Sequence, residues 1–130
     1  MLNHIMIGSN DIHKTKAFYN AVLGVLGAQE PMEHVNDTGQ TRLFYIHDGS
    51  TFSISEPING QPVSTANGST IGFLCNSPAQ VKTFHDVAIA HGGTSAEDPP
   101  GAREGSMGTM HLCYFLDPDG HKICGIHRPA

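Results

Sequence analysis

The feature that most constrains the fold is a repeat, because the signals that open and close a helix occur twice in the same order. Each copy offers a polar residue that can cap a helix, an aromatic residue two turns later and a glycine that can end the helix. The equivalent residues, 66 positions apart, are Asp11 and Ser77, Phe18 and Phe84, and Gly27 and Gly93. Neither unit could bury a sheet alone, so the two should pack together or against those of a second chain.

The first copy reads as a strand, a helix and a hairpin. Residues 2–8 alternate in polarity, which predicts a half-buried strand, and apolar residues at three- to four-residue spacing predict a helix over about 12–23. Two further strands are expected at 41–46 and 51–56. Residues 57–68 hold several prolines and glycines with little apolar periodicity, which indicates a linker.

The second copy follows the same order. A strand is expected at 70–75, a helix at about 78–91, a Pro/Gly-rich loop at 97–106 and a closing hairpin around Asp117-Pro118-Asp119-Gly120. The sequence therefore predicts one α+β domain over 1–130, with module 1 at about 1–58, a linker at about 57–68 and module 2 at about 69–130. Each module is expected to have the order βαβββ.

Composition and charge exclude some classes of binding partner. The net charge is −5 with neutral histidines, and the seven Lys and Arg residues are scattered, which argues against nucleic acid and anionic membranes. No apolar run approaches the ~20 residues of a membrane span. The three cysteines form no paired motif, so reduced thiols and a cytoplasmic location are expected.

Several segments together resemble the vicinal oxygen chelate superfamily, which includes glyoxalase I, fosfomycin and bleomycin resistance proteins and extradiol dioxygenases. The segments are His4-Ile5-Met6-Ile7-Gly8, Asp11, Lys16-Ala17-Phe18-Tyr19, Val22-Leu23-Gly24 and Asp117-Pro118-Asp119-Gly120-His121-Lys122-Ile123. The resemblance covers nearly the whole chain. It implies two paired βαβββ modules whose mixed sheets curl into an open cup.

The resemblance also identifies the positions that hold a divalent metal in the metal-dependent members. These are His4, Ser53, Thr70 and Cys124, and only His4 keeps a ligand type of the family. Hydroxyls are weak ligands, and no carboxylate remains to offset the charge of a dication. No metal or other cofactor is therefore expected. If a metal binds, His4 and Cys124 are the candidate ligands, since both residue types bind zinc.

Two classes of function stay open. The first is a protein that binds a small organic ligand in the cup, with His4, Met6, Ser53, Thr70, Leu112, Tyr114, Cys124 and Ile126 as the ligand-binding residues. The second is an enzyme, a lactoylglutathione-lyase-like lyase or an extradiol-type dioxygenase, with an unorthodox Zn, Ni, Mn or Fe site. Tyr114 and Cys124 are then the catalytic candidates, because extradiol dioxygenases carry a substrate-contacting Tyr at the position of Tyr114, and an imidazole can activate a thiol.

Two structural expectations accompany these readings. Period-two alternation places His4, Ser53, Thr70 and Cys124 opposite the apolar residues that should meet the helices, so the four are expected to converge on one cup. The short linker and the family resemblance suggest a homodimer. The sequence leaves open whether each cup forms within one chain or across two.

Overall fold

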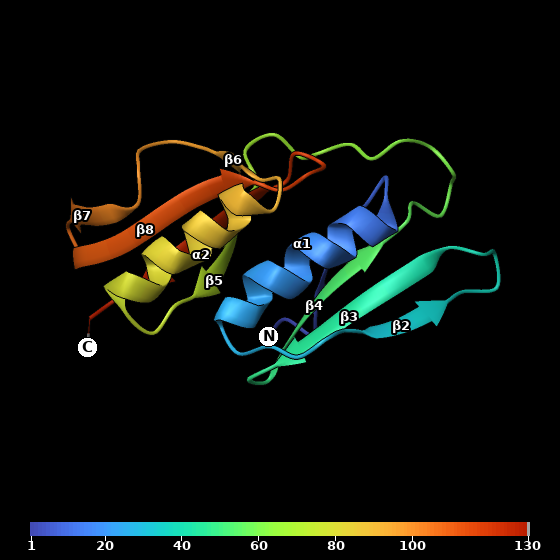
Figure 1. Cartoon of the computed structure of the whole chain (residues 1–130), viewed down its shortest axis with the longest axis horizontal. Coiled ribbons are helices and arrows are strands. Elements are labelled where there is room, and N and C mark those ends of the chain that lie inside the picture. Colours follow the sequence, from blue (N-terminus) through green and yellow to red (C-terminus); the bar gives the residue numbers. More distant parts are fainter. Residues whose placement is uncertain (130) are drawn as a thin grey trace.

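The computed structural model describes residues 1–129 and contains two helices and nine strands in this range (Figure 1). Module 1 consists of β1 (Ile5–Gly8), α1 (Ile12–Val25), β2 (Met32–Val35), β3 (Thr41–His47) and β4 (Ser50–Ser55). Module 2 consists of β5 (Ile71–Leu74), α2 (Pro78–Ala90), β6 (Thr94–Ser95), β7 (Gly101–Gly105), β8 (Gly108–Leu116) and β9 (Lys122–His127).

Each module forms its own open, mixed sheet. The first has the order β1-β4-β3-β2, and the second has the order β5-β9-β8-β6 with β7 also paired to β8. In both sheets the strand before the helix pairs in parallel with the last strand of the module, β1 with β4 and β5 with β9. The predicted α+β fold with two βαβββ units is confirmed, and the second unit carries one additional short strand.

The two helices begin where the repeat predicts. The side chain of Asp11 accepts a hydrogen bond from the Lys14 amide (3.2 Å), and the Ser77 hydroxyl accepts one from the Gln80 amide (3.0 Å). Pro78 occupies the first position of α2, where its missing N–H costs no helical hydrogen bond. In the part of the chain that the structure describes, no helix is long and apolar enough to cross a membrane.

A single hydrophobic core joins the modules. Helices α1 and α2 lie side by side in front of the two sheets (Figure 1). Beneath them, six aromatic side chains from five elements form a closed ring with neighbouring centroids 4.9–6.0 Å apart. In order around this aromatic ring they are Phe18, Tyr19, Phe52, Phe73, Phe84 and Phe115. Its contacts cross from one module to the other twice, at Phe52–Phe73 and at Phe18–Phe115, so neither module has a complete core of its own.

The turn between β8 and β9 fixes the start of module 1 to the end of module 2. Asp117 accepts a hydrogen bond from the Tyr19 hydroxyl (2.6 Å), and Asp119 accepts one from the Asn10 amide (3.0 Å). The His121 side chain is hydrogen-bonded to the carbonyl of Gly8 (2.8 Å). The predicted turn at Asp117-Pro118-Asp119-Gly120 therefore also holds the two modules together by hydrogen bonds.

Some boundaries differ from the sequence prediction. Strand β1 begins at Ile5 instead of residue 2, because its backbone pairing with β4 starts only there, opposite Phe52, although β4 itself begins at Ser50. The polar stretch before Thr41 contains β2, which pairs with β3, and residues 97–106 are not a plain loop, since they contain β7, paired antiparallel with β8. Both segments lack apolar alternation, so backbone pairing to a neighbouring strand decides their structure.

Candidate functional site

One face of the second sheet, turned away from the helices, gathers four of the eight predicted ligand-binding residues. Tyr114 of β8 lies directly opposite Cys124 of β9, and Leu112 lies opposite Ile126. Because side chains alternate along a strand, these four share a face, whereas Phe115 and Ile123 point into the core. We call this surface the β8–β9 face.

Tyr114 and Cys124 are in mutual contact at the centre of the β8–β9 face. Burial raises the pKa of the Cys124 thiol, and the neighbouring Tyr114 hydroxyl offsets part of that rise. Burial also raises the pKa of Tyr114, with further contributions from Cys124 and Glu97. Both groups therefore remain protonated near neutral pH and can donate hydrogen bonds to a ligand, but Cys124 is not an activated nucleophile.

Lys122, which is not among the residues predicted from the sequence, completes this face. Lys122 precedes Cys124 by two residues and so lies on the same side of β9, with its Nζ 5.0 Å from the centre of the Tyr114 ring. It forms an ion pair with Glu97, which lies in the loop between β6 and β7. Period-two spacing could have identified Lys122 from the sequence, but nothing in the sequence links Glu97 to it.

Arg103 of β7 holds this loop in place. Its guanidinium donates hydrogen bonds to the backbone carbonyls of Pro99 (2.9 Å) and Asp98 (3.2 Å). The amide of Ala96 donates to the carbonyl of Tyr114 (3.0 Å), so the loop is fixed at both ends beside the β8–β9 face. Glu97 itself has φ = 56°, a left-handed conformation that is unfavourable for a residue with a side chain.

The corresponding face of the first sheet contains Met6 and Ser53. These residues are direct neighbours on β1 and β4, and Phe44 of β3 lies on the other side of Ser53. The Ser53 hydroxyl is fully buried and has no hydrogen-bond partner within the described part of the chain. A buried hydroxyl without a partner is costly, which marks it as a group that a ligand or a water molecule could satisfy.

The remaining two predicted residues lie just outside the strands. His4 precedes β1 and is exposed, with its Nδ1 2.7 Å from the side-chain oxygen of Asn3. Thr70 precedes β5 and is also exposed. The structure thus brings six of the predicted residues together as two groups. Met6 lies with Ser53, and Leu112, Tyr114, Cys124 and Ile126 lie together on the β8–β9 face. The convergence of His4, Ser53, Thr70 and Cys124 on one cup stays a prediction.

The donor set at the family's metal positions does not fit a divalent ion. The matched side chains are one imidazole, two hydroxyls and a thiol whose burial favours the neutral form, from His4, Ser53, Thr70 and Cys124. Among residues 1–129, no three His, Cys, Asp or Glu side chains lie close enough together to hold an ion. Without a carboxylate, these residues provide little to compensate the charge of a dication.

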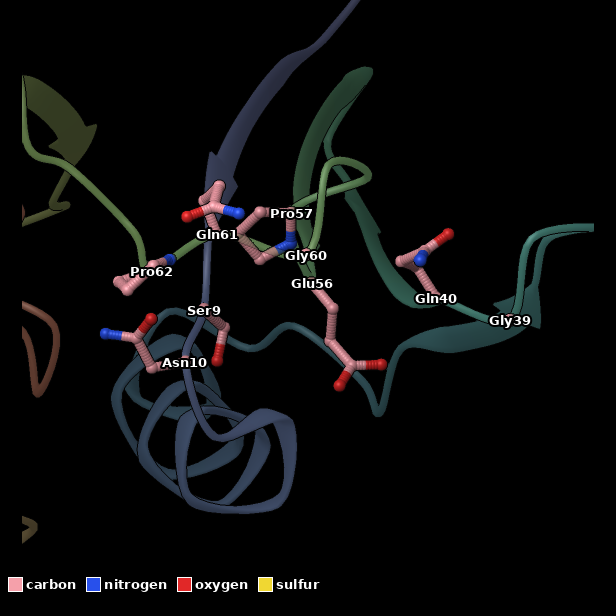
Figure 2. A pocket seen from close by; sticks show the side chains of 9 residues that line it. All are labelled: Ser9, Asn10, Gly39, Gln40, Glu56, Pro57, Gly60, Gln61 and Pro62. Carbon is pink, nitrogen blue, oxygen red and sulfur yellow. The ribbon is translucent and has the colours of Figure 1, made fainter.

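Two open cavities lie elsewhere, the first between module 1 and the linker and the second on module 1. A cavity of about 490 Å³ is bordered by loops, and Figure 2 shows its mostly polar lining. Much of that lining already has partners, since Asn10 accepts a hydrogen bond from the Val63 amide (2.8 Å) and Glu56 accepts one from the Thr41 amide (2.8 Å). A second cavity of about 500 Å³ includes Phe44, so it extends beside the face that bears Ser53.

The fold and the sequence both match known proteins. The model of the Glyoxalase/Bleomycin resistance protein/Dioxygenase superfamily matches residues 1–124. A glyoxalase/bleomycin resistance protein from Albidiferax ferrireducens T118 is 48% identical, with 98% of this chain and 99% of that chain covered and a TM-score of 0.89.

More distant structures share the fold. The fosfomycin resistance protein FosX from Listeria monocytogenes, in complex with Mn(II) and sulfate, is 20% identical over 99% of this chain and 93% of that chain, with a TM-score of 0.72. A V278E mutant of glyoxalase I from Zea mays is 16% identical over 96% of this chain and 45% of that chain, with a TM-score of 0.75. The family match over residues 1–124, together with the paired βαβββ modules, establishes that the chain belongs to the Glyoxalase/Bleomycin resistance protein/Dioxygenase superfamily.

Proposed function

We propose that the protein binds a small organic molecule on the helix-distal faces of its sheets and does so without the divalent ion used by metal-dependent members of the superfamily. The observation that carries this proposal is the donor set at the four matched positions, which lacks a carboxylate and retains a protonated thiol at Cys124. Such a set suits hydrogen bonding to an organic ligand better than coordination of a dication.

The proposed ligand contacts combine apolar surface with few polar groups. Leu112, Ile126 and Met6 supply apolar area, and Tyr114, Cys124 and Ser53 supply hydrogen-bonding groups. Most small-molecule sites have this composition, because apolar contacts provide affinity and a few polar groups fix the orientation. Bleomycin resistance proteins, a branch of the same superfamily, provide the precedent for ligand binding as the whole function.

A second copy of the chain is the proposed completion of the site. Leu74, on the same side of the second sheet as Cys124, is 77% exposed, and Ile46, on the face of Ser53, is 60% exposed. Within residues 1–129, strands β1 and β5 each form an unpaired edge of their sheet. Exposed apolar side chains beside open edges favour association, so we propose a homodimer whose ligand site takes one module from each chain. The three free thiols support a cytoplasmic location.

The alternative is an enzyme that uses a divalent metal, either a lyase or a dioxygenase. The specific observation in its favour is the contact between Tyr114 and Cys124 at the centre of the β8–β9 face, where both catalytic candidates meet. The Mn(II) complex of FosX belongs to a protein of the same fold. In this reading His4 and Cys124 would bind the ion with an additional ligand.

Calorimetric titration with Ni²⁺, Zn²⁺ and Mn²⁺ separates the two readings. The unmodified protein, purified without chelators, should bind none of them tightly. The double variant Thr70→His, Cys124→Glu restores two family-type ligands and should gain affinity into the micromolar range, about −8 kcal/mol. Tight binding of one ion by the unmodified protein, lost in His4→Ala, would refute the metal-free proposal and support the enzyme.

A further inference from the structure

We infer that the ligand is a small organic anion with an apolar body, that its acidic group pairs with Lys122, and that it displaces Glu97 from that lysine. The inference rests on the proposed function, since it assigns the chemical class of the molecule bound at the same site. It also gives roles to two residues outside the family's ligand positions.

Lys122 is placed to receive an acidic group at the centre of the site. Its ammonium lies 5.0 Å from the centre of the Tyr114 ring, and Cys124 follows it on the same side of β9. A carboxylate bound to Lys122 could therefore also accept hydrogen bonds from the Tyr114 hydroxyl. Charge-assisted hydrogen bonds of this kind are stronger than neutral ones. The apolar body would then lie along Leu112 and Ile126.

The distribution of charge over the sheets agrees with an anionic ligand. Three of the seven basic residues lie on the helix-distal faces, since residues that pair across neighbouring strands point to the same side of a sheet. They are Arg42, opposite Ser55, Arg103, opposite Met110, and Lys122, opposite Leu116. The acidic residues within the described strands, Glu33 and Glu104, lie on the opposite side, beside Leu43 and Thr109. Two acidic residues outside the strands, Glu30 and Asp48, border the second cavity, which is the one that includes Phe44.

Without a ligand, the carboxylate of Glu97 pairs with Lys122 in the way that the acidic group of the ligand would. Its side chain is about half exposed and that of Lys122 about one-third exposed, so water screens the ion pair and the pair contributes little to stability. The backbone of Glu97 is in a left-handed conformation, whereas the flanking residues are fixed by Arg103 and by the backbone bond from Ala96. Replacement of the Glu97 carboxylate by the acidic group of a ligand therefore costs little free energy. It also allows the backbone of Glu97 to leave the left-handed conformation.

The test uses benzoate and benzamide, which have the same shape and differ in charge, with phenylphosphonate as a second anion. Binding to the full-length protein is followed by NMR shifts of the backbone amides of Tyr114 and Cys124. Benzoate and phenylphosphonate should bind at least about tenfold more tightly than benzamide at low salt. Lys122→Met should remove that preference and Lys122→Arg should retain it, which separates loss of charge from a folding defect.

Two further variants test whether Glu97 competes with the ligand and whether the effect is specific to Lys122. Glu97→Gln should raise the affinity for benzoate about two- to fivefold, because the competing carboxylate is gone. Lys82→Met is the matched control, since Lys82 also pairs with a carboxylate, that of Asp86, but lies on α2 away from the site, and it should change nothing.

The outcomes are distinguishable. Benzamide binding on the β8–β9 face as tightly as benzoate, or Lys122→Met leaving benzoate binding intact, would overturn the inference and leave the proposed function standing. Shifts of the two amides by none of the three compounds would overturn both the inference and the placement of the ligand on this face. An effect of Lys82→Met equal to that of Lys122→Met would show that net charge, and not the site, governs binding.

Discussion

Tyr19→Phe removes one hydroxyl that connects the two modules, and we expect it to destabilise the protein strongly for so small a change. The Tyr19 side chain is fully buried on α1 and donates its proton to the Asp117 carboxylate at 2.6 Å. Asp117 is itself buried, and its other oxygen accepts hydrogen bonds from the amides of Asp119 and His121. Without Tyr19, one buried carboxylate oxygen loses this partner.

The expected cost is about 1.5–3 kcal/mol near pH 8, the range for a hydrogen bond to a charged group. Burial raises the pKa of Asp117, and the Tyr19 hydroxyl lowers it in part. Asp117 therefore stabilises the fold most below its unfolded pKa of about 3.9, and this contribution is lost as the pH rises through the folded pKa. Loss of the Tyr19 donor raises the folded pKa further, so the cost of Tyr19→Phe should increase with pH.

Urea denaturation at about pH 4 and about pH 8 measures both predictions. Tyr45→Phe is the matched control, because the Tyr45 hydroxyl donates to the neutral amide oxygen of Asn20 (2.8 Å) within module 1. That substitution should cost about 0.5–1.5 kcal/mol and depend little on pH. An equal cost for the two substitutions, or a Tyr19→Phe cost that does not change with pH, would refute the charge-assisted bond.

The other predictions concern assembly and packing. Light scattering should show a dimer at micromolar concentration, and a monomeric unmodified protein would contradict the proposed assembly. Leu74→Asp should dissociate the dimer, whereas Ile58→Asp, at a similarly exposed position in the linker, should not. Gly125→Ala should cost about 1–3 kcal/mol by denaturation, because the added methyl group would lie 2.8 Å from the buried ring of Phe84, whereas Gly72→Ala meets no atom within 4 Å and should be tolerated. Equal stability of these two glycine variants would show that the core can yield at Phe84.

The sequence predicted those parts of the fold that depend on local chemistry. Helix starts at Asp11 and Ser77 follow from capping, which involves residues only three positions apart. Strands β2 and β7 were missed, because their structure depends on partners elsewhere in the chain. His4 falls outside β1 for the same reason, since the start of this strand is decided by its pairing with β4, which begins at Ile5 opposite Phe52.

In the candidate site, too, local patterns were predictable and contacts between distant segments were not. Alternation along β8 and β9 was sufficient to place Tyr114 and Cys124 on one face, because register is fixed by the turn that joins the strands. The ion pair between Glu97 and Lys122 connects a loop to a strand 25 positions later, through an unusual backbone conformation. No local pattern encodes such a contact, and it became visible only in three dimensions.

The aromatic ring has a consequence for how the chain holds itself together. Since the ring crosses between the modules at Phe52–Phe73 and Phe18–Phe115, the halves relate to each other as two tightly bound partners joined by residues 57–68. The linker then acts by setting the effective concentration of one half around the other, on the order of millimolar for a short flexible tether. Its length determines how fast and how often the halves meet, while the aromatic side chains determine how firmly they stay together.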